Sequence, residues 1–117
     1  MTVKALLRPG GIDRLLADRR RQVLVGTLDD AVVGLAVGRI DQVGDATIGI
    51  VDACYVEPEA RELGVGRALL DSSVEWLQRS GCRGVDASAL PGDRLTKGFF
   101  EAAGFKARMI TMHQGLE

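Results

Sequence analysis

The sequence of 117 residues has few of the side chains from which metal and disulfide sites are built. It contains two cysteines, one histidine, one tryptophan, one tyrosine and three phenylalanines. Cys54 and Cys82 lie in apolar stretches, with no Cys-x-x-Cys pair and no cysteine and histidine spacing suited to a metal. We therefore expect two free thiols, without a disulfide or a zinc site. The single histidine, His113, is expected to be an exposed strand-end residue and not a catalyst.

Long apolar runs and an excess of one charge are also absent. The apolar stretches, such as residues 31–38, are much shorter than the about 20 residues that cross a bilayer, and the N-terminus lacks the apolar part of a signal peptide. Fifteen basic and sixteen acidic residues leave a formal charge of -1, so no overall field draws the chain to nucleic acid or to an anionic membrane. We expect a cytoplasmic protein with neither partner, folded as one domain over residues 1–117.

Extended segments dominate the first half of the chain. Three runs rich in β-branched residues follow one another, at residues 22–28, 31–40 and 46–56. Asp29 and Asp30 separate the first two runs, and Gly44 and Asp45 separate the next two. Pro58 has no N–H for a strand ladder, so it marks the end of the third run. This order predicts an antiparallel meander.

The second half of the chain changes to a helical period. Apolar residues recur at helical spacing from Gly66 until Gly81, which is suited to a left-handed cap. Asp93 predicts the start of a second helix, which Gly104 ends. The remaining predicted elements are a helix over 11–20 and strands over 84–90 and 105–112. This order predicts an α/β fold with a mixed sheet and helices on its faces.

The stretch "ARELGVGRALL" places Gly64 and Gly66 where an irregular polar segment enters the longest predicted helix. The start of a helix exposes unpaired N–H groups and a partial positive charge, and glycines let an anion approach them. A Walker A loop would need lysine after its last glycine, where this chain has Arg67. A dinucleotide fingerprint would need a third glycine, where this chain has Leu69. Both alternatives are unlike this sequence.

Two motifs together resemble the GNAT superfamily of N-acetyltransferases. The segment "CYVEPEARELGVGRALL" is similar to the family's pyrophosphate loop, Arg/Gln-x-x-Gly-x-Gly/Ala, which matches at Arg61, Gly64 and Gly66. The segment "FFEAAGF" is similar to the family's Phe/Leu-Tyr-Glu-x-x-Gly-Phe. Both segments stand in the family's order, with a helix and a strand between them. The resemblance covers residues 22–112.

The resemblance implies a compact, end-shortened GNAT fold, with a central, mostly antiparallel sheet flanked by helices. It implies transfer of an acetyl group from acetyl-CoA to a primary amine of a small molecule or of a peptide or protein. The cofactor would lie between the strand that ends at Val56 and the strand that follows Gly84. Arg61 and Arg67 would either screen its phosphates or face solvent. An alternative is a regulatory module that binds acetyl-CoA with reduced or lost catalysis.

The resemblance also assigns backbone contacts to the cofactor. The pantetheine arm would pair with the backbone of Cys54, Tyr55 and Val56. The pyrophosphate would accept hydrogen bonds from the backbone of six residues, Glu62, Leu63, Gly64, Val65, Gly66 and Arg67. The side chain of Tyr55 would pack or contact the cofactor.

Asp52 is the candidate general base, because an amine must lose a proton before it can attack a thioester. It precedes the cofactor-pairing residues in an apolar run, where similar proteins often carry a glutamate. A merely hydrogen-bonded aspartate is the competing interpretation. The oxyanion would be met by a backbone N–H near Tyr55 or Val56, where the family's strand bulges.

The chain departs from the family pattern in its chemistry and in its length. Phe100 stands where the family commonly has a tyrosine that protonates the leaving thiolate, and Asp93 stands where it has an asparagine. A thiol is a tolerable leaving group, so the reaction can proceed without that acid. The family's first strand and its last strand have no counterpart in the predicted elements. Open sheet edges invite pairing with a second copy, so we predict a homodimer.

Overall fold

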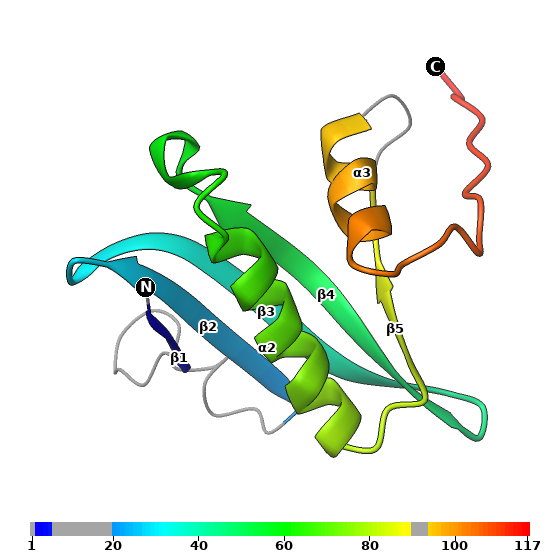
Figure 1. Cartoon of the computed structure of the whole chain (residues 1–117). Helices are drawn as coiled ribbons and strands as arrows, with labels where there is room; N and C mark the ends of the chain where they lie inside the picture. The colour runs from blue at the N-terminus through cyan, green and yellow to red at the C-terminus, as the bar shows by residue number, and fades with distance from the viewer. Residues whose placement is uncertain (1, 6–19, 90–93) are drawn as a thin grey trace.

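The computed structural model describes residues 2–5, 20–89 and 94–117. Its elements are β1 (Thr2–Ala5), β2 (Arg21–Leu28), β3 (Ala31–Val43), β4 (Ala46–Val56), the 3₁₀ turn η1 (Pro58–Ala60), α2 (Val65–Arg79), β5 (Gly84–Ala87) and α3 (Arg94–Ala102). The five strands form one sheet in the order β1-β2-β3-β4-β5. The first four are antiparallel, and β5 runs parallel to β4. The predicted mixed, mostly antiparallel sheet is confirmed (Figure 1).

Tight turns build the central meander, as their residue types predict. Asp29 and Asp30 connect β2 to β3 with φ values of 49° and 68°, and Gly44 begins the next turn with φ of 59°. Two successive left-handed residues match the twist of a two-residue hairpin. The turns therefore connect β2, β3 and β4 as an antiparallel meander.

Replacing Asp30 by glycine should raise the free energy of unfolding by about 0.5–1 kcal/mol. A left-handed conformation costs a non-glycine residue about 1–2 kcal/mol, which exceeds the extra backbone entropy that glycine loses on folding. Asp45→Gly is the control, because Asp45 lies in the next turn without a positive φ, and this change should lower stability. Chemical denaturation measures both. Equal destabilisation by the two changes would contradict the prediction.

Helix α2 packs across one face of the sheet at unusually short range. A Cβ built on Gly26 would lie 2.8 Å from Val65 Cγ1, and one on Gly34 would lie 2.8 Å from Leu69 Cδ1. Glycines on the neighbouring strands β2 and β3 thus let the helix approach the backbone of the sheet closely. Leu69 is fully buried in this contact. The packing places the first turn of α2 beside the end of β4 (Figure 1).

Aromatic side chains connect α3 to the same core. Phe99, Phe100 and Phe105 pack against a buried cluster that contains Leu70 and Leu77. The ring centroids of Phe99 and Phe100 are 5.3 Å apart, as are those of Phe100 and Phe105. Edge and tilted ring contacts of this kind stabilise helix packing. Among the described helices, none is long and apolar enough to cross a bilayer.

Several predicted boundaries need correction. Strand β1 was not predicted, although it pairs with β2 where we expected no first strand. The strand predicted over 84–90 ends at Ala87. The predicted strand over 105–112 is wrong, because this segment pairs with none of the described strands and takes no regular structure. A strand-forming sequence becomes a strand only where another strand accepts its hydrogen bonds. The predicted helix over 11–20 lies outside the described residues except for Arg20, which is in a turn, and the predicted N-cap Asp93 lies outside them as well.

Candidate active site

Strands β4 and β5 are paired along only part of β4. Their register runs from Ile48 opposite Gly84 to Val51 opposite Ala87. Beyond this point β4 continues to Val56, still paired on its other side with β3. The two strands separate toward the end of β4 that lies near α2 (Figure 1). The backbone of residues 53–56 therefore presents to this opening an edge that β5 does not cover.

A β-bulge lies where β4 begins to part from β5. Val37 faces Ala53, whereas the next residue, Gly38, faces Val51. Asp52 is therefore the extra residue of the bulge. We expected the bulge near Tyr55 or Val56, but the ladder there is regular. The expected position was wrong, because the register is set by cross-strand packing that local sequence does not reveal.

The Asp52 carboxylate lies among cations and not in an apolar site. Arg39 Nε donates to both carboxylate oxygens, at 3.0 and 2.9 Å. Arg21 Nη1 lies 3.9 Å from Oδ2, and the Asp52 side chain is one third exposed. The apolar run in the sequence predicted apolar surroundings for Asp52, and this prediction is wrong. The sequence carried a signal for this ion pair, because a turn at Gly44 places Arg39 on the strand next to the one that contains Asp52.

Among the described residues, no acidic side chain of the protein occupies the start of α2. Its N-cap, Gly64, has φ of 82° and ψ of 4°, no side chain caps the helix, and its first turn carries no acidic residue. The unpaired N–H groups and the partial positive charge of this helix end therefore meet no side-chain acceptor among the described residues. Glu62, with φ of 74°, bends the loop that leads into it.

Gly64 and Gly66 are required for different reasons. A Cβ on Gly64 would enter open space, so the left-handed backbone is what favours glycine there. A Cβ on Gly66 would lie 3.3 Å from both Phe99 Cε1 and Val56 Cγ2. Gly66 thus allows close packing of α2 on α3 and β4. This packing role of Gly66 adds to the approach of an anion that the sequence predicted for both glycines, and that prediction stays a prediction.

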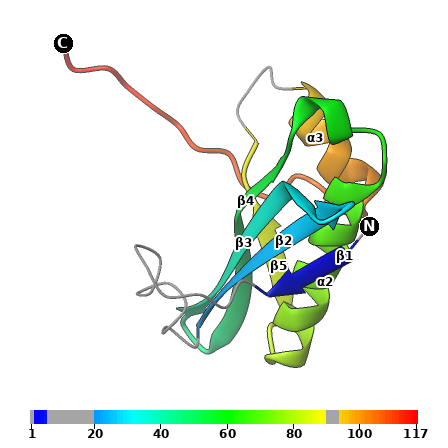
Figure 2. The same ribbon diagram turned by 90° about the vertical axis from the view of Figure 1, so that its left-hand side faces the viewer.

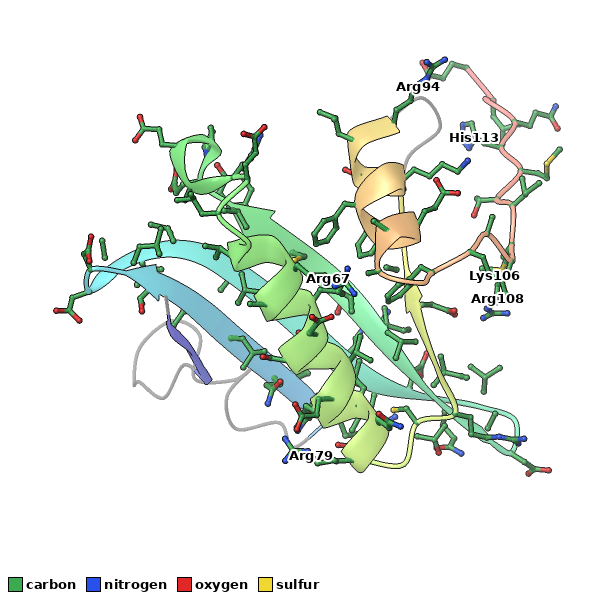
Figure 3. The ribbon with its side chains drawn as sticks, viewed as in Figure 1. Arg67, Arg79, Arg94, Lys106, Arg108 and His113 are labelled. Atoms are coloured by element: carbon green, nitrogen blue, oxygen red, sulfur yellow. The ribbon has the colours of Figure 1, made fainter. Side chains whose placement is uncertain are left out.

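The arginines of the loop are engaged within the protein. Arg61 Nε donates to the Val56 carbonyl at 3.0 Å, and the guanidinium lies 5.7 Å from the centroid of the Tyr55 ring. Arg67 Nε donates to Asp71 Oδ1 at 3.0 Å, and its Nη1 donates to the Ala102 carbonyl at 3.2 Å. Figure 3 shows Arg67 on the side of α2 that faces α3. Arg67 therefore ties α2 to the last residue of α3.

Cys54 points from β4 toward the start of α2. Its Sγ lies 3.7 Å from the carbonyl oxygen of Gly66, to which the thiol donates. Burial raises the pKa of the Cys54 thiol to about 11. A protonated thiol under the loop can serve as a packing group and a weak donor, but not as a nucleophile.

Alkylation of Cys54 at pH 8 should be on the order of 10²-fold slower in the folded chain than in denaturant, because only the thiolate reacts. Since the folded pKa is raised, the thiol's contribution to stability is full below the ordinary thiol pKa and is lost as the pH rises through about 11. A Cys82→Ser background isolates the rate at Cys54. Equal rates in folded and unfolded chains would show that the thiol is accessible.

Comparison with known proteins gives a consistent result. The family model described as the acetyltransferase (GNAT) family matches residues 5–105. An aminoglycoside N(6')-acetyltransferase type 1 from Stenotrophomonas maltophilia is 31% identical over 110 residues, which are 87% of this chain and 72% of that protein.

Solved structures share the fold. The aminoglycoside N-acetyltransferase AAC(6')-Iy in complex with CoA has a TM-score of 0.76 at 21% identity, covering 88% of this chain and 82% of that one. A putative acetyltransferase from Agrobacterium tumefaciens has a TM-score of 0.80 at 18% identity, covering 89% and 74%. The separation of β4 from β5 and the start of α2 without a side-chain cap are consistent with the family that the model matches. The chain belongs to the acetyltransferase (GNAT) family and is an acetyl-CoA-dependent N-acetyltransferase.

Proposed function

We propose that the chain acetylates an amino group of a small molecule of the aminoglycoside class. The observation that carries the site assignment is the open edge of β4 beside the uncapped start of α2. An extended amide-containing arm can pair with such an edge, and a diphosphate suits such a helix end. The relative that is 31% identical is named as an aminoglycoside acetyltransferase, which supports this acceptor class.

The proposed cofactor contacts follow the backbone. Cys54, Tyr55 and Val56 would pair with the pantetheine arm through the edge that β5 leaves uncovered. The loop from Glu62 to Arg67 would donate N–H groups to the pyrophosphate. The contacts of Arg61 with Val56 and Tyr55 indicate that this side chain shapes the loop, and any contact with phosphate would add to that role.

Asp52 is the proposed base. Bound acetyl-CoA supplies an acetyl thioester, which reacts with a neutral amine. Asp52 takes a proton from the acceptor's ammonium group. Arg39 holds the Asp52 carboxylate in place with hydrogen bonds to both of its oxygens. The edge of β4 over residues 53–56, which β5 leaves uncovered, would supply a backbone N–H to the thioester carbonyl. Phe100 carries no hydroxyl, so it could not give a proton to the thiol product, and that proton would come from water or from the acceptor.

Binding and turnover test the proposal separately. Acetyl-CoA at 100 times its dissociation constant should stabilise the chain by about 2.7 kcal/mol in a thermal-shift titration. Release of free thiol is then followed with aminoglycosides, a lysine-containing peptide and an acidic amino acid. The acidic amine is included because Arg21 and Arg39 lie beside Asp52. No binding at millimolar acetyl-CoA would refute the site, and turnover with the peptide alone would refute the acceptor class.

We also propose a homodimer in the cytoplasm. Among the described strands, β5 stands last in the sheet and pairs on one side only. An open edge of this kind supports association with another copy.

A further inference from the structure

The sheet has one face that neither described helix covers. Helices α2 and α3 lie on the same side of the sheet (Figure 2). Cys54 and Val56 face that side, because the Cys54 thiol donates to the Gly66 carbonyl and a Cβ on Gly66 would lie 3.3 Å from Val56 Cγ2. Successive side chains of a strand alternate between its two faces. Ala53 and Tyr55 therefore lie on the opposite face, which we call the second face.

The candidate base lies on the same second face. On β3, Gly38 faces the helices, because a Cβ on it would contact α2. The next residue, Arg39, thus points to the second face, where its Nε donates to both carboxylate oxygens of Asp52. A strand advances about 3.3 Å per residue, so Tyr55 lies within about 10 Å of Asp52 along β4. Between them the exposed Ala53 offers only a methyl group.

The ring of Tyr55 is available to a ligand. Its side chain is 50% exposed, and the residue opposite it on β3, Leu35, is partly buried. The Arg61 guanidinium lies 5.7 Å from the ring centroid, and its Nε donates to the Val56 carbonyl. This contact supports the ring from the cofactor loop while half of the side chain stays exposed. An exposed aromatic ring beside a reacting group is a surface on which a ligand can pack.

The carboxylates near this ring are already paired with arginines. Arg21 and Arg39 both contact Asp52, and Arg39 Nη1 also lies 3.7 Å from Asp41 Oδ2. Arg61 lies beside the aromatic ring. A further ammonium group on the acceptor would gain little from carboxylates that are paired in this way, and it would be repelled by the guanidinium groups. The second face therefore favours recognition of an uncharged part of the acceptor.

We propose that Tyr55 determines acceptor specificity by packing against the sugar ring that carries the reactive amine. This inference rests on the proposed function, because it concerns the acceptor of that reaction. One face of a sugar ring presents C–H groups, which pack on an aromatic ring without any charge. A sugar ring placed on Tyr55 and over Ala53 brings its amine to Asp52. A larger side chain at position 53 would occupy that space.

Two acceptors with one amine each test the role of the ring in steady-state kinetics. One is a methyl aminodeoxyglucoside, and the other is the open-chain aminohexanol. Tyr55→Ala should raise the KM of the sugar amine about tenfold, and leave the KM of aminohexanol and of acetyl-CoA unchanged. Tyr55→Phe keeps the ring and should keep all three values. Val43→Ala is the control, because Val43 is 60% exposed and lies at the far end of β3.

The kinetic outcomes separate this inference from the proposed function. An equal rise in the KM of both amines, or a loss in Tyr55→Phe as large as in Tyr55→Ala, would overturn the role of the ring while acetyl transfer itself stands. A parent chain that acetylates neither amine and no aminoglycoside would refute the proposed function, and this inference with it.

A fluorine label reports the contact without turnover. Tyr55 is the single tyrosine of the sequence, so growth with fluorotyrosine places one reporter at this position. CoA at saturation replaces acetyl-CoA, so no acetyl group is transferred. In fluorine NMR the sugar amine should then move the resonance in a saturable way, whereas aminohexanol should not. A resonance that moves with CoA and responds to neither amine would show that Tyr55 contacts the cofactor instead, and the inference would be wrong.

Discussion

Asp52→Asn should lower the rate constant of acetyl transfer by about 10²–10⁴-fold, the usual contribution of a positioned general base, while acetyl-CoA still binds. Asparagine keeps the shape of the side chain and can still accept from Arg39, so the bulge should survive. What it cannot do is take the proton from the acceptor's ammonium group. Steady-state release of free thiol gives the rate, and the thermal shift with acetyl-CoA gives binding.

Asp41→Asn provides the matched control. Asp41 Oδ2 lies 3.7 Å from Nη1 of the same Arg39 that holds Asp52. This change removes a carboxylate from that arginine and leaves Asp52 intact, so we expect a nearly unchanged rate. If Asp52→Asn also keeps the full rate, its carboxylate serves only to pair with Arg39 and another group or a water is the base.

Gly64→Val should weaken acetyl-CoA binding about 5- to 150-fold. The N-cap of α2 has φ of 82°, and a left-handed conformation costs a non-glycine residue about 1–3 kcal/mol, which is about 5- to 150-fold in a binding constant. The variant can relieve the strain only by turning the loop, which moves the N–H groups away from the pyrophosphate. Calorimetric titration of acetyl-CoA measures the loss.

Gly81→Val introduces the same backbone strain at the C-terminal end of α2. Gly81 has φ of 91°, and a Cβ there would also meet open space. Its effect should therefore fall on the stability of the fold and not on cofactor affinity. Equal affinities of the two variants for acetyl-CoA would mean that the conformation of Gly64 does not matter for binding.

Local chemistry made much of this fold predictable. The turns predicted at Asp29, Asp30 and Gly44 and the left-handed cap predicted at Gly81 are confirmed, and all four residues have positive φ. The meander between these turns follows from them. The start of α2 was also placed within one residue, because the change from an irregular to a helical period is a local signal.

Features that depend on distant partners were not predictable in the same way. β1 is four residues long, and only its pairing with β2 makes it a strand. Residues 105–112 have the composition of a strand, but none of the strands that the structure describes pairs with them. The bulge at Asp52 depends on how β3 packs beside it. The contacts of Arg67 with α3 link residues 35 positions apart, a distance over which local patterns carry no information.

The contact between Gly66 and Phe99 limits how these two positions can vary. Alanine at 66 would need Phe99 or Val56 to yield by a few tenths of an ångström, whereas a larger residue would need a smaller partner at one of them. Substitutions at 66 and 99 should therefore be correlated in homologous sequences, and a bulky residue at both should be rare. The loop motif and the aromatic motif of this chain, separated in sequence, are thus in direct steric contact in the fold.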